Sequence, residues 1–246
     1  MRRLFPRSFL PATVLSAIVG GGILAGSWLF PLPAEALSDE DIVDKLEQVP
    51  VFIILNSDGQ PLTASAEANN QEVKVPVVFI DGETAETFLD QAQAEDQSAT
   101  IALIDLGTLY QETHLSAEAA TPLLYFPIVE ELDTAMGMEE DFQGVPLFIA
   151  RQGEDGPYLT ITQNGETSLP MFFSRNDLQT LLDRYAETDA AAAQEIVVQV
   201  LSLEWLLATM ATNEDPALDA QLEQVRLFPS TEVLNYIRSQ QPESGQ

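Results

Sequence analysis

Short runs of branched and aromatic residues, separated by turn residues, are the clearest pattern along the chain. Six such runs predict strands: 51–55, 75–80, 101–106, 158–162, 169–173 and 196–201. Asp58-Gly59 and Asn164-Gly165 are typical tight-turn pairs between strands. We therefore expect a three-stranded meander in each half of the chain, followed by a fourth strand, with the polar stretch 63–74 forming a long loop in the first half.

Apolar residues at helical spacing follow the strands. Leu178, Leu181 and Leu182 give one such stripe, and Ser174 before them opens a segment close to a capping box. Ser38 precedes an acidic first turn and is expected to cap a short leading helix. Further helices are expected from Asp81 onward, over 203–212 with Pro216 as the stop, and over 230–239 with Ser230 as the cap.

The two halves resemble each other in the same order. Val49-Pro-Val-Phe-Ile53 and Val145-Pro-Leu-Phe-Ile149 match at four of five positions. At a constant offset of 94, one set of residues matches another: Asn70, Glu72, Pro76 and Phe79 with Asn164, Glu166, Pro170 and Phe173. A period of about 95 residues is longer than that of solenoid repeats. The predicted fold is α+β, with two pseudo-symmetric repeated lobes, each a small antiparallel-rich sheet with packed helices.

The beginning of the chain resembles an export signal. Arg2, Arg3 and Arg7 precede an apolar run over 9–30, and Ala34-Glu-Ala36 offers a small-residue cleavage site. An uncleaved anchor is the alternative, because about 20 apolar residues can span a bilayer. The expected division is a signal peptide at 1–36, a first lobe at 37–130, an acidic linker at 131–141 and a second lobe at 142–246.

Charge and composition exclude several classes of function. The chain has 10 Lys and Arg against 39 Asp and Glu, a net charge of −29 that repels nucleic acids. It has no cysteine and one histidine, which excludes thiolate and multi-histidine metal sites. No phosphate-binding loop or dinucleotide-binding motif is present in the mature part. We expect no cofactor, no metal, and partners that are basic or apolar.

Catalytic signals are sparse, and we expect no catalytic residues and no enzyme activity. A hydrolase would have to use His114, the only histidine, and the sequence has no Gly-x-Ser-x-Gly elbow. A hydrolase of exported substrates that uses His114 remains an alternative from another class. The acidic stretch 130–141 matches no calcium-loop spacing and is interpreted as a solvated linker.

Phenylalanines recur at corresponding positions of the two halves. The matched pairs are Phe52 with Phe148, Phe79 with Phe173, and Phe126 with Phe228. Phenylalanine on a strand is most often part of the core. The alternative is that some of them line an apolar groove for a client polypeptide. The candidate groove residues are Phe52, Phe79, Phe126, Phe148, Phe172, Phe173 and Phe228.

The ordered motifs resemble those of one family. The Val-Pro-x-Phe-Ile motif, the Asp-Gly turn, the hairpin at Asn164-Gly165 and the Pro-x-Phe-Phe-Ser join at 170–174 are similar to the twenty-two-kilodalton component of the translocon at the inner chloroplast envelope (Tic family), in its cyanobacterial form. The likeness covers about 37–239.

The resemblance implies a chaperone-like carrier in protein transport and outer-membrane biogenesis, located in the periplasm or, alternatively, in the thylakoid lumen. The implied partners are unfolded or immature outer-membrane proteins and the periplasmic domains of the outer-membrane insertase. No stable membrane insertion is expected after signal cleavage. A structural bridge between membrane complexes is the other reading of the same resemblance.

Overall fold

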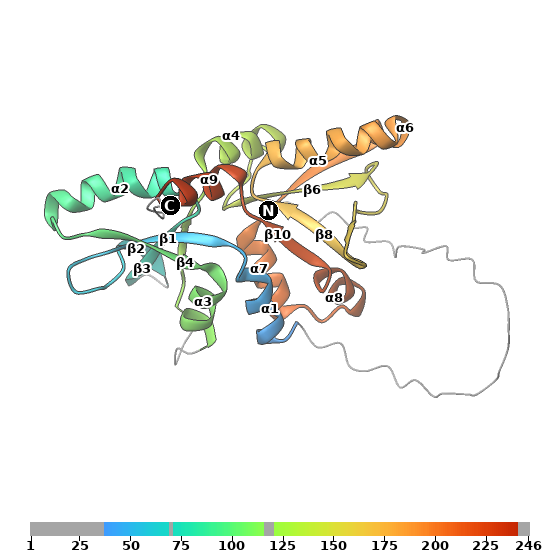
Figure 1. Ribbon diagram of the computed structural model, residues 1–246. Coiled ribbons are helices and arrows are strands. Elements are labelled where there is room, and N and C mark those ends of the chain that lie inside the picture. The colour runs from blue at the N-terminus through green and yellow to red at the C-terminus, as the bar shows by residue number, and fades with distance from the viewer. Residues whose placement is uncertain (1–36, 69–70, 116–120, 241–246) are drawn as a thin grey trace.

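The computed structural model describes residues 37–68, 71–115 and 121–240 (Figure 1). The expected signal peptide at 1–36 lies outside the described residues. Among those that are described, no helix is long and apolar enough to cross a membrane.

Two sheets of similar topology confirm the predicted α+β fold with two lobes. The first sheet has the order β2-β3-β1-β4, with β5 parallel to β3, and the second has the order β10-β8-β6-β9, with β7 paired to β8. The strands of the first sheet are β1 (Pro50–Leu55), β2 (Thr63–Ala68), β3 (Gln71–Phe79), β4 (Thr100–Asp105) and β5 (Leu124–Phe126). Those of the second are β6 (Pro146–Gln152), β7 (Ile161–Gln163), β8 (Glu166–Phe172), β9 (Ile196–Ser202) and β10 (Val225–Phe228).

Helices cover both sides of this pair of sheets. They are α1 (Asp39–Leu46), α2 (Gly82–Glu95), α3 (Leu106–Tyr110), the π-helical turn η1 (Gln111–Leu115), α4 (Val129–Met138), α5 (Arg175–Thr188), α6 (Ala190–Ala193), α7 (Leu203–Thr212), α8 (Pro216–Leu222) and α9 (Thr231–Gln240). Figure 1 shows α2, α9, α4 and α5 along one side of the sheets, and α1, α3, α7 and α8 on the other. One hydrophobic core joins both lobes around α1, α3 and α7, and a smaller one lies under α4 and α5.

The predicted meander is wrong in its strand order. β3 lies between β2 and β1, and β8 takes the same central place in the second sheet. The C-terminal parts of β3 and β8 are apolar and buried on both faces, which is typical of central strands. The polar strands β2 and β7 pair only with the N-terminal ends of their partners. Order in the chain therefore did not predict order in the sheet.

The polar stretch 63–74 was expected to be a loop, but it forms most of a hairpin. β2 pairs with β3 in antiparallel register from Thr63 opposite Pro76 to Ala68 opposite Gln71. Ala64 and Val75 face inward, whereas Thr63 and Lys74 are exposed. A hairpin at the margin of a sheet tolerates polar residues because one of its faces remains in water.

The predicted match of Phe79 with Phe173 is wrong by one residue. Phe52 lies opposite Phe79 in the first sheet, whereas Phe148 lies opposite Phe172 in the second. The structural counterpart of Phe79 is therefore Phe172, and Phe173 corresponds to Ile80. A shift of one residue moves a side chain to the other face of a strand, so a constant sequence offset misplaced this pair.

Three predicted helix caps are confirmed. The hydroxyl of Ser38 accepts from the N–H of Asp41, and that of Ser174 accepts from the N–H of Asp177. The Ser230 hydroxyl accepts from the N–H of Glu232. Pro216 does not stop α7, which ends at Thr212, but begins α8, where proline is favoured.

The stretch expected as an acidic linker forms α4, and α4 crosses to the second sheet. It follows β5 of the first sheet and packs against β6 and β9 of the second. Glu131 on α4 is buried and accepts a 2.9 Å hydrogen bond from the N–H of Arg175 at the start of α5. The interpretation of this stretch as wholly solvated is therefore wrong.

α9 makes the reciprocal crossing. It follows β10 of the second sheet and packs against α2 of the first. The Tyr236 ring lies edge-on to Phe52 at 5.5 Å, and its hydroxyl donates to Glu86 at 2.8 Å. Tyr236 also fills the space over Gly82, where a Cβ would overlap the ring. Each half thus supplies one helix to the other half, and the two halves stabilise each other.

Candidate functional site

Five of the seven candidate phenylalanines are core residues. Phe52, Phe79, Phe148, Phe172 and Phe173 are each at most 7% exposed. This burial agrees with the core interpretation of these five. A side chain so little exposed cannot touch a client unless the sheet opens, so the structure gives no support to their role in a groove.

The other two phenylalanines are half-buried and pack on the buried ones. Phe126 lies 5.3 Å from Phe79 and 4.9 Å from Phe88 of α2, between ring centroids. Phe228 stacks on Phe172 at 4.9 Å. The chain therefore brings these aromatics together as two separate clusters, one under α2 and one under α5, and not as one continuous exposed surface.

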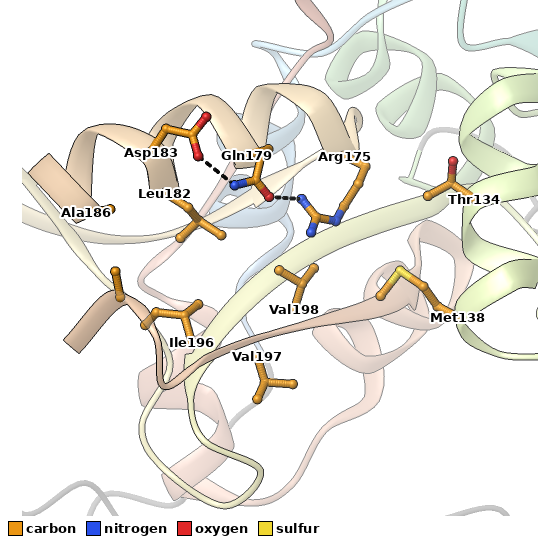
Figure 2. A pocket seen from close by; sticks show the side chains of 11 residues that line it. Thr134, Met138, Arg175, Gln179, Leu182, Asp183, Ala186, Ile196, Val197 and Val198 are labelled. Carbon is orange, nitrogen blue, oxygen red and sulfur yellow. Dashed lines mark hydrogen bonds between the residues drawn. The ribbon is translucent and has the colours of Figure 1, made fainter. Parts of the chain in front are cut away.

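One groove in the described part of the chain is lined by other residues. A groove of about 590 Å³ lies between α5, the end of α4, α6 and the strand β9 (Figure 2). Its apolar lining consists of Met138, Leu182, Ala186, Ala193, Ile196, Val197 and Val198. We call it the α5–β9 groove. Met138 is 42% exposed, so an apolar side chain is already presented to solvent at one end.

A row of polar side chains runs along the α5 wall of this groove. Arg175 donates to Gln179 at 3.0 Å, and Gln179 donates to Asp183 at 2.7 Å, at successive i, i+4 positions. Figure 2 shows this row beside Leu182, with Ile196 and Val198 on the facing strand. These polar groups bond to one another along the rim, and the apolar floor lies beside them.

The strand that forms the floor of the groove is at the edge of its sheet. β9 pairs with β6 on one side, and no strand of the described part of the chain pairs with its other side. Ile196, Val198 and Val200 point to the face covered by α5, where they pack against the smaller core. An apolar edge strand beside an apolar groove is a surface that other polypeptides can recognise.

Sequence reasoning missed this groove because it has no aromatic residue. The available signal was the Ile-Val-Val run that opens 196–201, which was interpreted only as a strand. Its edge position depends on pairing with β6, and the groove also needs α4 from the other half of the chain. Neither contact follows from local periodicity.

His114 is not placed in catalytic geometry within the described residues. Its ring stacks on Tyr110 with centroids 4.5 Å apart, and its Nδ1 lies 2.9 Å from the Thr113 hydroxyl. Burial lowers the pKa of His114 below its ordinary value. Neither contact is a serine nucleophile or a carboxylate, so these neighbours do not form a triad. No group of three or more His, Asp or Glu in the described ranges could hold a metal ion.

A polar contact within the second half holds the start of β6. Glu204 on α7 accepts hydrogen bonds of 3.0 and 3.3 Å from the N–H of Val145. A Cβ at the neighbouring Gly144, whose φ is +94°, would overlap that carboxylate. The Tyr125 hydroxyl from β5 is buried without a hydrogen-bond partner among the described residues. Burial, and then the charge of Glu204, raises the pKa of Tyr125.

Glu204 is expected to make stability depend on pH. Burial raises its pKa above the ordinary value, against the opposing effect of backbone hydrogen bonds. A carboxyl group with a raised pKa in the folded state contributes stability below its unfolded pKa and loses that contribution as the pH rises through the folded pKa. Glu204→Gln keeps an acceptor for Val145 and is expected to raise the melting temperature at about pH 7 but not at about pH 4.

Thermal unfolding of both forms at the two pH values checks this prediction. Glu214→Gln, at an exposed position just after α7, removes the same charge and is the matched control. A variant Glu204→Gln that is less stable than the wild type at about pH 7 would contradict the prediction, because the carboxylate would then be favourable despite its burial.

Comparison with known proteins identifies the family of this fold. The model of the Tic22-like family matches residues 16–239, and the chain belongs to that family. Anabaena Tic22, described as a protein of protein transport, is 26% identical with a TM-score of 0.67, over 85% of this chain and 100% of that one. Tic22 from Plasmodium falciparum is 21% identical with a TM-score of 0.59, over 80% of this chain and 96% of that one, and supports the fold alone. A search of curated protein sequences found no match. The resemblance expected from the sequence motifs is thereby confirmed.

Proposed function

We propose that this protein is a carrier that holds unfolded or immature outer-membrane proteins during protein transport. The observation that carries the proposal is the α5–β9 groove, whose floor is aliphatic and partly exposed. Binding there would remove apolar side chains of the client from water at about 25 cal/mol per Å². Such binding is reversible and tolerant of sequence, because apolar burial is not directional.

The charge of the chain supports the carrier role. A net charge of −29 keeps a carrier and its bound client soluble by repelling other carriers. The sequence has no nucleotide-binding motif, so the proposed holding is passive and is governed by affinity alone. Anabaena Tic22, the relative described as a protein of protein transport, supports the same class of activity.

The proposed location is the periplasm, with the thylakoid lumen as the alternative. The support is the basic, apolar and small-residue pattern of 1–36, which is typical of an export signal. The absence of cysteine is compatible with either compartment, because folding then needs no oxidant. The proposed partners, besides clients, are the periplasmic domains of the outer-membrane insertase.

A pair of methionine variants tests the proposal. Met138 lines the groove, and Met136 is exposed to a similar degree on the same helix but does not line it. Met138→Glu places a charge where apolar side chains of a client would pack, and desolvating that charge is costly. We expect the affinity for an unfolded outer-membrane β-barrel protein to fall about tenfold or more, equivalent to about 1.4 kcal/mol. Met136→Glu adds the same charge and is expected to leave the affinity almost unchanged.

The measurement is suppression of aggregation of the urea-unfolded barrel protein after dilution, as a function of carrier concentration. Equal activity of both variants and the wild type would contradict the role of the groove. Failure of the wild-type protein to suppress aggregation, together with tight binding to one folded insertase domain, would favour a structural bridge between membrane complexes.

A further inference from the structure

The outer edge of β9 has a specific binding geometry for polypeptide backbone. We propose that it binds an extended client segment as an added antiparallel strand, and that the preferred segment alternates apolar and basic residues. This inference rests on the proposed carrier function and specifies the conformation and chemistry of the client in the α5–β9 groove.

The pairing of β9 with β6 determines which backbone groups point outward. The N–H of Gly153 donates to the carbonyl of Glu195, and the N–H of Leu203 donates to the carbonyl of Val145. Bonded and non-bonded pairs alternate in an antiparallel ladder. Val197, Gln199 and Leu201 therefore bond to β6, and the residues that direct N–H and C=O groups away from the sheet are Ile196, Val198 and Val200.

The same three residues place their side chains on the α5 face, beside the groove. A residue directly opposite Val198 on an added strand has its side chain on the same face of the sheet. That side chain would therefore enter the groove between Leu182 and Ala186 of α5 and the floor of β9. Alternate residues of the client would point to the other face. Because only every second side chain of the client faces the groove, a segment that alternates apolar and polar residues fits, and a uniformly apolar segment is not required.

The charge of the chain specifies the polar half of the client. The alternate side chains of the added strand point to the other face of β9, on the side of α7 (Figure 1). α7 carries one acidic residue, Glu204, and no basic residue, and the chain has a net charge of −29. This negative charge favours lysine or arginine at the alternate positions of a client. It disfavours a second copy of this chain, which has the same negative charge.

The first sheet offers an internal comparison. β4 occupies the equivalent edge, with Leu103 opposite Phe52 as Val200 is opposite Phe148. Leu103 is 52% exposed, and no residue of β4 lines the α5–β9 groove or either of two other pockets of similar volume in the described residues. The two edges thus share backbone geometry and differ in the apolar groove, which makes β9 the preferred edge.

A peptide experiment with the full chain tests the inference. The probe is a peptide of alternating valine and lysine with as many residues as β9, and the readout is amide hydrogen exchange followed by NMR. We expect exchange to slow about tenfold or more at Ile196, Val198 and Val200 when the peptide is present. The amides of Val197, Gln199 and Leu201 already bond to β6 and should change little. The edge of β4 should not respond.

Two modified peptides sharpen the test. With valines facing the groove, the valine N–H groups donate to β9 and the lysine N–H groups point away from it. N-methylation of the valines should reduce affinity about tenfold or more, and N-methylation of the lysines should not. A peptide with glutamate in place of lysine should bind about tenfold more weakly at low salt.

The outcomes separate this inference from the proposed function. If the carrier suppresses aggregation but the peptide gives no alternating protection, or both N-methylated peptides bind equally, strand addition is wrong and the groove role stands. If the same amides become protected at high protein concentration without peptide, a second copy covers the edge and the inference is wrong. If the carrier neither suppresses aggregation nor binds the peptide, the proposed function itself fails.

Discussion

Replacing Phe148 with alanine is expected to lower the free energy of unfolding by about 3–5 kcal/mol. Phe148 is completely buried in the smaller core, at the register position opposite Phe172 and Val200. The truncation leaves a cavity under α4 and α5 that close-packed neighbours fill only in part. This cost is a large share of the 5–15 kcal/mol that stabilises a typical domain.

Urea unfolding followed by circular dichroism measures this effect, with Phe228→Ala as the matched control. Phe228 is half-buried and stacks on Phe172, so the same truncation there should cost clearly less. The comparison also decides between the two interpretations of the phenylalanines. A Phe148→Ala protein of unchanged stability that no longer holds clients would mean that Phe148 serves a groove and not the core.

Removing α9 is expected to destabilise the first lobe, although α9 follows the second lobe in the chain. A chain that ends at Ser230 loses Val233, which is buried, and Tyr236, which packs on Phe52. A fully buried side chain such as Val233 contributes about 1.5–3 kcal/mol and the partly buried Tyr236 contributes less, so the loss should be about 2–4 kcal/mol. The hydrogen bond from Tyr236 to Glu86 adds to the difference.

The control for this deletion is a chain that ends at Gln240, which keeps all of α9 and should unfold like the full chain. The measurement is urea unfolding, with hydrogen exchange at α2 and β1 to locate the loss. Destabilisation confined to the second sheet would contradict the reciprocal helix crossing. A chain of 37–130 alone should fold poorly for the same reason, since it lacks the helix that covers Phe52.

The local part of the fold could be predicted from the sequence because it depends on neighbouring residues. The strands after Val49-Pro50 and Val145-Pro146, and the serine caps at Ser38, Ser174 and Ser230, follow from residue type and spacing. The duplication was visible for the same reason. Two copies of one pattern must give two similar lobes, and the two sheets share a topology.

The pairing of strands could not be predicted in this way. A meander and the observed order contain the same runs of apolar residues. Only the burial of both faces near Phe79 and Phe172 favours a central position for β3 and β8. The one-residue error that paired Phe79 with Phe173 has a similar origin, because sequence offsets ignore which face a strand residue occupies.

The acidic stretch 130–141 was misinterpreted because its many acidic residues obscured the apolar side of a helix. Its charges suggested solvent, but Ala135 and Leu132 give it an apolar side that packs on the second lobe. Glu131 is buried because it accepts a hydrogen bond at the start of α5, where the helix dipole favours a negative charge. The groove depends on this helix, so missing α4 also meant missing the site.

Site-specific photocrosslinking is the most direct test of the central claim that clients occupy the α5–β9 groove. A photoreactive phenylalanine analogue would be placed at Ala186, which lines the groove, or at Leu103, which is exposed on the edge of the other sheet. The client is an unfolded outer-membrane β-barrel protein. The account predicts a covalent adduct from position 186 and little or none from position 103. Adducts of equal yield from both positions, or from position 103 alone, would contradict it.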